Sequence, residues 1–372
     1  MPTRPLRSLL RAGVCPLALV AVATAWWACE RRSGTLVGPD PTATPRSVGP
    51  HELAVLGFYN VENLFDPADD PDNPGDDEFL PAAAKRWDSL RYAGKLELLA
   101  RVIAGLGGEG EGPALLGLAE VENARVLRDL AAEPALADGD YGLVHYDSPD
   151  YRGIDVALLY RRGDFRVLTS RPIAVTLPPR EGSTRVRTTR DVLYVAGLLR
   201  GDTLHLLVNH WPSRGGGEER SRPDRARVAR VVRGVVDSLR AADPAADVAV
   251  LGDLNDDPTD ASVAEVLGAS GERALASDVL LYNPFVEPFR RGEGSLGYRR
   301  QWNLFDQIVV SAGLTAPGGD WSVREAAVFA PAYLLQDTGR YRGFPERTYI
   351  GDAYRGGASD HLPVYVVLER PR

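Results

Sequence analysis

The stretch Gly356-Gly357-Ala358-Ser359-Asp360-His361-Leu362-Pro363 stands directly before the last apolar run of the chain, residues 364–368. In it a carboxylate lies beside one of only five histidines, after two glycines. An Asp-His pair at the mouth of a strand indicates metal binding or acid–base chemistry. The pair alone is a weak signal. It becomes specific only if polar residues at other strand ends converge on it.

Polar residues also stand where five other apolar runs begin or end. They are Asn60 after 53–59, Glu120 after 114–119, Asn209 and His210 after 203–208, Asp253 and Asn255 after 248–252, and Asp306 before 308–310. Any one of them is typical of a turn or a helix cap. Six such run ends together favour one site at the edge of a sheet. Asp253 and Asn255, two residues apart, are expected to point to the same side.

Short runs of Val, Leu, Ile and Tyr, bounded by Gly, Pro and Asp, predict many strands. Apolar residues recur at three and four over 92–106, which predicts a helix with Lys95 outside. A second helix is predicted over 228–239 behind Pro223, and a third over 122–137. Many strands with helices between them indicate an α/β or α+β sandwich.

The N-terminus has the pattern of an export signal. Three arginines precede an uncharged, mostly apolar run over 12–28, and Cys29 follows a small residue. We therefore expect a signal peptide of the lipoprotein type over 1–28, a flexible tether over 29–50 and a single catalytic domain over 51–372. A plain cleaved signal or an uncleaved anchor is the alternative. Both cysteines lie in this leader, so the folded part has no disulfide.

The polar residues at these strand ends offer oxygen ligands for a metal ion, and such ligands suit hydrolysis at phosphorus. Oxygens such as those of Glu120, Asp360 and Asn60 prefer Mg²⁺, Mn²⁺ or Ca²⁺ over zinc. A calcium-binding EF-hand over 253–264 is excluded, because Pro258 and Ala264 stand where that loop needs glycine and glutamate. The sequence also has no Gly-x-Ser-x-Gly elbow, His-Glu-x-x-His motif or P-loop.

From Leu53 to Leu368 the chain resembles the endonuclease/exonuclease/phosphatase superfamily. The matching segments are Phe58-Tyr59-Asn60, Ala119-Glu120-Val121, Asn209-His210, Gly252-Asp253-Leu254-Asn255, Phe305-Asp306-Gln307-Ile308 and Ser359-Asp360-His361. The resemblance implies a four-layer sandwich, with two mixed β-sheets packed face to face and helices outside. It also implies a cleft at one edge of the sheets.

The resemblance further implies a role for each matching residue. Glu120 is the expected principal metal ligand, with Asn60 close by and Asp360 as a further ligand; Glu122 is the alternative to Glu120. His361 is the expected catalytic histidine, oriented by Asp306. The remaining catalytic residues are Asp253 and Asn255, which position water and phosphate, and His210, which contacts the scissile phosphate. Whether His361, His210 or Asp253 is the general base stays open.

Four further residues are candidates for substrate contact: Arg152, Asn209, Trp211 and Arg214. Asp155 is either another contact or the buried partner of Arg152. The acidic, Pro-rich stretch 66–78 is interpreted as a solvated loop, with a Ca²⁺ site as the alternative. His145 is expected at the surface.

These features predict an exported phosphodiesterase of the nuclease type, dependent on Mg²⁺ or on Mn²⁺ or Ca²⁺, that uses in-line attack by an activated water. The net charge of −8 excludes a non-specific nucleic-acid coat but allows a local basic cleft. The alternative is a phosphatase or a phospholipid-headgroup phosphodiesterase at the cell envelope, where Cys29 would anchor it to the membrane. A non-catalytic binding module is a remoter alternative. We expect a monomer.

Overall fold

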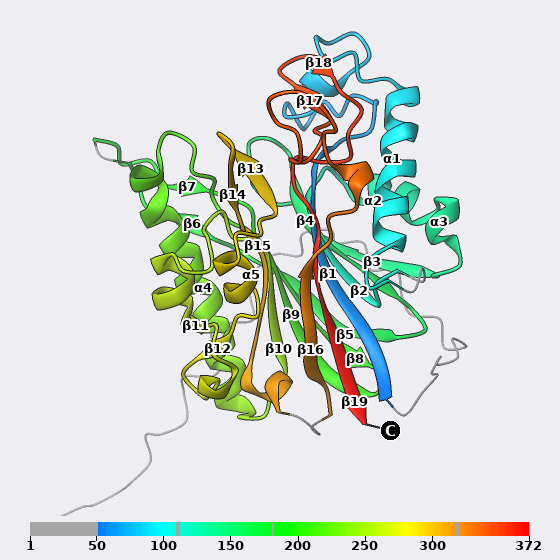
Figure 1. The fold of residues 1–372 in the computed structure, drawn as a ribbon. Helices are drawn as coiled ribbons and strands as arrows, with labels where there is room; N and C mark the ends of the chain where they lie inside the picture. Colours follow the sequence, from blue (N-terminus) through cyan, green and yellow to red (C-terminus); the bar gives the residue numbers. More distant parts are fainter. Residues whose placement is uncertain (1–50, 109–111, 181, 317–319, 372) are drawn as a thin grey trace, which may run out of the picture. The chain divides into compact units, whose positions relative to one another are not determined.

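The computed structural model describes residues 51–108, 112–180, 182–316 and 320–371 (Figure 1). The predicted signal peptide over 1–28, the tether over 29–50 and the lipidation site Cys29 lie outside the described residues. Within the described ranges, no helix combines the length and the apolar character that a membrane crossing requires.

Two β-sheets organise the described residues. The first has the strand order β16 (Ser322–Val328), β19 (Val364–Pro371), β1 (His51–Leu64), β2 (Leu115–Val121), β4 (Asp155–Arg161), β3 (Tyr141–His145). The second has the order β11 (Ala269–Ser270), β12 (Leu281–Tyr282), β15 (Asp306–Val310), β10 (Val248–Asp253), β9 (Asp202–His210), β8 (Val192–Leu199), β5 (Phe165–Ile173). Both sheets are mixed, since the parallel pairs β1–β2 and β9–β10 lie among antiparallel neighbours.

Helices and two-stranded hairpins complete the described part. The α-helices are α1 (Ser89–Ala104), α2 (Ala124–Ala131), α3 (Pro134–Ala137), α4 (Glu218–Ala242) and α5 (Val286–Arg290). The hairpins are β6 (Thr176–Leu177) with β7 (Arg187–Thr188), β13 (Leu296–Tyr298) with β14 (Gln301–Asn303), and β17 (Tyr349–Ile350) with β18 (Ala353–Tyr354). Single helical turns lie at Asp77–Phe79, Ser262–Leu267, Arg273–Leu275, Ala312–Thr315 and Ala332–Leu334.

The two sheets pack face to face through one apolar core. Leu56 and Phe58 of β1 share this core with Val208 of β9 and Leu251 of β10. The sheets approach so closely that a Cβ on Gly117 would lie 2.8 Å from the Leu251 side chain. Each such buried side chain contributes roughly 1.5–3 kcal/mol relative to exposure.

Helices cover the outer face of each sheet, which completes the expected four layers. On the first sheet, Leu99 of α1 and Val126 of α2 pack against Val61 of β1. On the second sheet, Val232 of α4 packs in one cluster with Val250 of β10. The four-layer arrangement predicted from the sequence is therefore confirmed.

Lys95 departs from its predicted position outside α1. Its side chain is buried, and its ammonium donates to the Glu62 carbonyl and, over 2.7 Å, to the Thr348 hydroxyl. Burial lowers the pKa of Lys95 to about 8. Apolar spacing could not predict this, because the stem of a lysine packs like an aliphatic side chain while its head finds acceptors.

Two helix boundaries also differ from prediction. The helix expected over 122–137 is divided into α2 and α3, because Glu133 is extended before Pro134. Helix α4 begins at Glu218, ahead of Pro223. The buried Arg225 fixes this early turn, since it donates to the Ser221 hydroxyl and pairs with Asp256 at 2.7 Å.

Candidate active site

Strand register places three of the predicted catalytic residues side by side in the second sheet. Asp253 closes β10 and pairs with His210 at the end of β9 and with Asp306 at the start of β15. The parallel strands end where the antiparallel strand begins, so the three side chains share one edge of the sheet. All three are buried.

Asp253 connects this edge to the first sheet. Its Oδ2 accepts a 3.0 Å hydrogen bond from the Asn60 amide of β1. The same oxygen lies 3.6 Å from His210 Nε2 and 3.8 Å from His361 Nε2. One carboxylate oxygen is thus the centre on which both histidines and the amide converge.

His361 is held by contacts on both its ring and its backbone. Its Nδ1 pairs with Asp306 Oδ2 at 2.6 Å, and its backbone N–H donates to the Ser359 hydroxyl. Ser359 in turn donates to the Asn60 carbonyl. Because Nδ1 is committed to Asp306, Nε2 is the ring atom that faces Asp253 and, at 3.9 Å, Asp360.

His210 lies on the other side of Asp253. Its Nε2 is 3.9 Å from Glu120 Oε1. Arg190 holds the backbone here, since it donates to the carbonyls of His210 and Trp211. No pattern in the sequence predicts this role of Arg190.

The two histidines have opposite electrostatic environments. Burial, followed by the charges of Arg190 and Arg152, lowers the pKa of His210 well below its usual value. Burial alone would lower the pKa of His361 as well, but Asp306 and Asp253 raise it well above its usual value. The site therefore favours a neutral His210 and a cationic His361. Burial, partly opposed by His361, raises the pKa of Asp253 to about 7.

Glu120 sits at a local break in β2. Its backbone has a φ of 63°, and the pairing of β2 with β4 shifts register between Ala119 and Val121. Its Oε2 accepts the Asn63 N–H at 3.0 Å, and Arg152 lies 3.6 Å from Oε1. A non-glycine residue held at positive φ costs about 1–3 kcal/mol and is typical of functional sites.

Asp360 is bound to an arginine that the sequence analysis missed. Arg347 Nη2 lies 2.5 Å from Asp360 Oδ2, and its Nε lies 3.3 Å from the buried Glu62 carboxylate. Arg347 and Glu62 also line a pocket of about 260 Å³, together with Asn63, Phe79, Lys85, Thr348, Tyr349, Ile350 and Gly351. The pocket is therefore adjacent to the carboxylate site.

The oxygen donors of this site fit a divalent cation. Glu120 and Asp360 each present a carboxylate that is paired with arginine, and Asp306 Oδ1 is buried with no hydrogen-bond partner among the described residues. Ligand atoms of Asp253, Asp306 and His361 also lie within 4.8 Å of one another. His361 Nδ1 is committed to Asp306, however, so the carboxylate and amide oxygens are the better ligands.

Asn209 and Trp211 do not lie at an accessible surface. Both are fully buried, and the Trp211 indole donates to the Asn209 side chain at 3.1 Å. The Asn209 amide itself donates to the Leu207 carbonyl. These side chains stabilise the end of β9 from inside, and their predicted role as substrate contacts stays a prediction.

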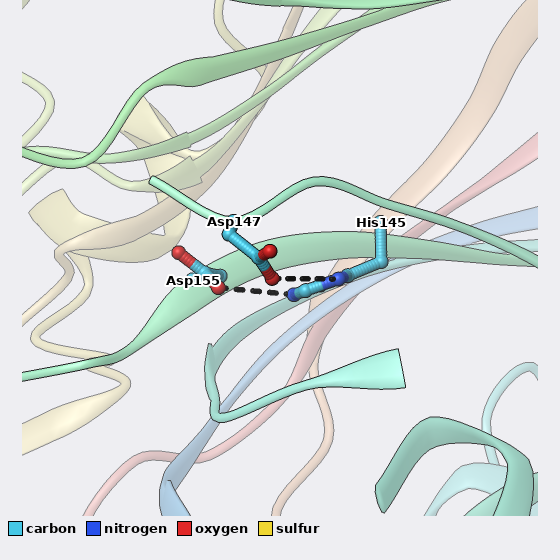
Figure 2. A group of neighbouring side chains, drawn as sticks. All are labelled: His145, Asp147 and Asp155. Atoms are coloured by element: carbon cyan, nitrogen blue, oxygen red, sulfur yellow. Dashed lines mark hydrogen bonds and ion pairs between the residues drawn. The ribbon is translucent and has the colours of Figure 1, made fainter. Parts of the chain in front are cut away.

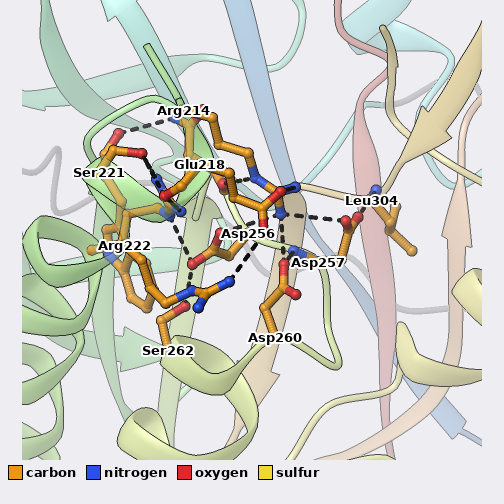
Figure 3. A network of polar contacts seen from close by, with 12 residues as sticks. Arg214, Glu218, Ser221, Arg222, Asp256, Asp257, Asp260, Ser262 and Leu304 are labelled. Atoms are coloured by element: carbon orange, nitrogen blue, oxygen red, sulfur yellow. Dashed lines mark hydrogen bonds and ion pairs between the residues drawn. The ribbon is translucent and has the colours of Figure 1, made fainter. Parts of the chain in front are cut away.

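Arg214 lies among acidic side chains (Figure 3), and its predicted role as a substrate contact stays a prediction. Its guanidinium lies 2.5 Å from Asp260, 3.2 Å from Asp256 and 3.4 Å from Asp257. It donates to the Asn255 carbonyl as well. A cation already surrounded by carboxylates has little capacity left for a phosphate.

Asn255 does not obey the strand alternation that was used to orient it. Strand β10 ends at Asp253, and Asn255 has a φ of 50°. Its amide donates to the Trp211 carbonyl, while its backbone N–H donates to Asp253 Oδ1 at 2.9 Å. The residue supports Asp253 through its backbone, and its predicted catalytic role stays a prediction.

Arg152 is the one predicted substrate contact that the structure places beside the site. Asp155 is not its partner, because Asp155 pairs with His145 at 3.0 Å (Figure 2). Asp155 also accepts two hydrogen bonds from Ser148. His145, expected at the surface, is buried between Asp155 and the exposed Asp147. This cluster fixes the loop that carries Arg152 towards Glu120.

Comparisons with known proteins agree with the geometry. The family model of the endonuclease/exonuclease/phosphatase family matches residues 55–370. A solved structure of a family member from Bacteroides thetaiotaomicron has a TM-score of 0.53 at 16% identity, covering 87% of this chain and 99% of that chain. No match was found among curated proteins.

Two further solved structures resemble the chain. A mannosyl-6-phosphatase of Bacteroides thetaiotaomicron has a TM-score of 0.52 at 16% identity and covers 85% of this chain and 99% of its own. TDP2 of D. rerio, complexed with a single-strand DNA product, has a TM-score of 0.50 at 17% identity, covering 85% and 98%. At these identities the likeness concerns the fold alone. The family match, which spans most of the chain, shows that this protein belongs to the endonuclease/exonuclease/phosphatase family of metal-dependent phosphoric ester hydrolases.

Proposed function

We propose that this protein is an exported phosphodiesterase of the nuclease type that depends on Mg²⁺, with Mn²⁺ or Ca²⁺ as possible substitutes in the assay. The observation that carries the proposal is the convergence of Asn60, His210 and His361 on one oxygen of Asp253. Glu120 lies 3.9 Å from His210 Nε2 and Asp360 lies 3.9 Å from His361 Nε2, so both carboxylates border this centre.

The residues that hold the ion are proposed to be Glu120 and Asp360, with the Asn60 amide close by. When bound, the ion supplies charge neutralisation at the phosphate and lowers the pKa of the attacking water. Arg152 and Arg347 now pair with these two carboxylates. A cation on the carboxylates would free both arginines to contact phosphate oxygens of the substrate.

The proton chemistry is assigned from the opposite environments of the histidines. Asp253, whose pKa burial raises to about 7, is positioned to take the proton of the attacking water. The cationic His361, oriented by Asp306, donates a charged hydrogen bond to the phosphate and stabilises the negative charge of the transition state. The neutral His210 orients the leaving oxygen. Among His361, His210 and Asp253, we therefore favour Asp253 as the general base.

A phosphomonoesterase is the second candidate, and the pocket beside Arg347 favours it. A volume of about 260 Å³ between Lys85 and Arg347 suits a small phosphorylated molecule better than a polymer. The net charge of −8 also favours a small substrate over nucleic acid.

The two candidates are separated by one substrate panel. The purified full-length chain is assayed with Mg²⁺, Mn²⁺ or Ca²⁺ on plasmid DNA, bis-p-nitrophenyl phosphate, p-nitrophenyl phosphate and phospholipid vesicles. We expect diester hydrolysis that EDTA abolishes and that Glu120→Gln reduces strongly. Hydrolysis of the monoester alone would select the second candidate, and no hydrolysis with any metal would refute the proposed activity.

Export and anchoring are proposed from the sequence of the first 29 residues. We propose that Cys29 is lipidated and holds a monomeric enzyme at the cell envelope. Labelled palmitate should be incorporated into the wild type and lost in Cys29→Ser. Label that persists in the variant would exclude this site.

A further inference from the structure

The acidic loop between β1 and α1 contains carboxylates that the proposed reaction does not use. One oxygen from each of Asp69, Asp76 and Asp77 lies within 4.8 Å of the other two. Asp69 and Asp77 are exposed, whereas Asp76 is buried. Acidic clusters are common on surfaces, so the buried member is the informative one.

Asp76 has one carboxylate oxygen without any partner. Its side chain is 0% exposed, and its Oδ2 accepts the Asp70 N–H at 2.8 Å. Its Oδ1 is buried and accepts no hydrogen bond from the described residues. A buried charged acceptor without a hydrogen-bond partner carries the full cost of its desolvation. The partner of Asp76 Oδ1 is therefore a hydrogen-bond donor or a cation that binds at the loop.

Within the described residues, this group of carboxylates has no cationic side chain as an ion-pair partner. Among the described residues, no lysine or arginine forms an ion pair with Asp69, Asp76 or Asp77, although arginines pair with acidic residues at many other places in the molecule. Three carboxylates converge here, and one of them has a free buried oxygen. This charge pattern is complementary to a divalent cation.

We propose that Asp69, Asp76 and Asp77 form a calcium site distinct from the active site. The donors are all oxygens, and they come from one irregular loop. Ca²⁺ accepts six to eight oxygen ligands in flexible geometry and takes backbone carbonyls and water readily, whereas Mg²⁺ demands a near-ideal octahedron. Two exposed carboxylates also leave room for water ligands. The loop therefore suits Ca²⁺ better than Mg²⁺.

The position of the loop gives this calcium site a function. A Cβ on Gly75 would lie 2.0 Å from the Arg152 carbonyl oxygen, and one on Gly153 would lie 1.8 Å from the Asn73 side chain. The loop is thus in close backbone contact with the segment that carries Arg152 to within 3.6 Å of Glu120. Calcium bound to the loop would stabilise this rim of the active site, so Arg152 would act as a residue positioned through the loop.

Binding can be measured without any enzymatic activity. The full-length chain carries Glu120→Gln, which removes the main expected ligand of the active site, and is titrated with Tb³⁺ as a luminescent substitute for Ca²⁺. Trp87 is the sensitiser, since its ring lies 6.5 Å from Phe79 at the end of the loop. We expect Tb³⁺ emission that Ca²⁺ displaces at lower concentration than Mg²⁺, and a rise in Tm with Ca²⁺.

Two variants and a control decide the assignment. Asp76→Asn and the exposed Asp69→Asn should each weaken binding roughly tenfold or more. Asp72→Asn, which removes an equal charge from an exposed position in the same loop, should leave binding unchanged. Asp69→Asn keeps the test valid if the buried substitution prevents folding. Equal binding by Asp69→Asn and Asp72→Asn, or displacement by Mg²⁺ as effective as by Ca²⁺, would overturn the proposal.

The link to catalysis has a separate readout and rests on the proposed function. At saturating Mg²⁺, added Ca²⁺ should lower the KM of the wild type for the diester and leave that of Asp69→Asn unchanged. A chain without phosphoesterase activity would remove this arm only, because the Tb³⁺ titration would still decide whether the site exists. A KM that responds equally in both proteins would refute the positioning role.

Discussion

Two buried histidine–aspartate pairs in this molecule have the same composition and different surroundings. His361 pairs through Nδ1 with Asp306 at 2.6 Å, and His145 pairs through Nε2 with Asp155 at 3.0 Å. The second nitrogen of His361 faces Asp253 and Asp360. Within the described part of the chain, the second nitrogen of His145 has one ion-pair contact, with the exposed Asp147 at 3.9 Å (Figure 2).

The comparison shows that the pair itself does not make a catalytic site. In the His145 pair, the other carboxylate oxygen of Asp155 is satisfied by two hydrogen bonds from Ser148. In the His361 pair, Asp306 Oδ1 has no partner among the described residues. A satisfied pair stabilises a loop, whereas a pair beside further unsatisfied acidic groups retains capacity for a cation or substrate.

The largest expected effect is on the rate after loss of His361. His361→Ala should lower kcat by a factor on the order of 10²–10⁴, the usual scale for a positioned acid–base group. His145→Ala is the matched control and should keep kcat within a few-fold per folded molecule. Initial rates on the diester, normalised to the folded fraction, measure both. Equal losses in the two variants would remove the distinction between the pairs.

The second prediction concerns the pH dependence that Asp253 confers. Because burial raises its pKa to about 7, the carboxylate is protonated as the pH falls through that value and the base form is lost. The kcat/KM of the wild type should therefore decrease on the acidic side of neutrality. Asp253→Asn should be slower by a factor on the order of 10² and should lack this acidic limb. An unchanged acidic limb in Asp253→Asn would assign the titration to another group.

The third prediction is that substitution of Asp155 mainly lowers stability, whereas substitution of Asp306 mainly lowers kcat. Asp155→Asn weakens a buried pair and should lower the free energy of unfolding by about 1–3 kcal/mol, with kcat reduced less than tenfold. Asp306→Asn removes the partner of a cationic histidine and should lower kcat by a factor on the order of 10². Urea denaturation and steady-state kinetics on both variants test these opposite effects on stability and kcat. A larger kcat loss in Asp155→Asn than in Asp306→Asn would contradict it.

The smallest expected effect concerns Arg152, which the His145 pair supports through its loop. Arg152→Gln should raise KM for the diester roughly tenfold, the value of one charged hydrogen bond to phosphate. Arg222→Gln, at an exposed arginine that pairs with Glu219, should change KM by less than twofold. Matching shifts in both variants would indicate general charge attraction and not a specific contact.

The sequence predicted the fold, and it predicted which polar strand ends meet at the candidate site, because both depend on simple alternation. Apolar runs located the central strands, and polar residues at their ends identified Asp253, Asp306 and His361. Alternation fails where the backbone leaves the strand, at the positive φ of Glu120 and Asn255. It therefore could not orient Asn255.

Contacts between residues from different segments of the chain could not be predicted from local sequence patterns. Arg347 contacts Asp360 from the segment before β17, and Arg190 holds the backbone of His210 from the segment before β8. Asn209 and Trp211 follow an apolar run and look accessible in sequence, but the second sheet and α4 bury them. These contacts and this burial depend on how the sheets and helices pack together, and a short sequence pattern carries no information about that packing.

The hydrogen bond between Asn60 and Asp253 joins strands of different sheets. Each sheet alone provides only part of the proposed reactive groups, because Asn60 and Glu120 belong to the first sheet and Asp253 and Asp306 to the second. We therefore expect hydrolysis only from molecules in which the two sheets have packed together. Activity in this protein reports completed folding, and a simple colour assay would serve as a measure of how many molecules have reached the native state.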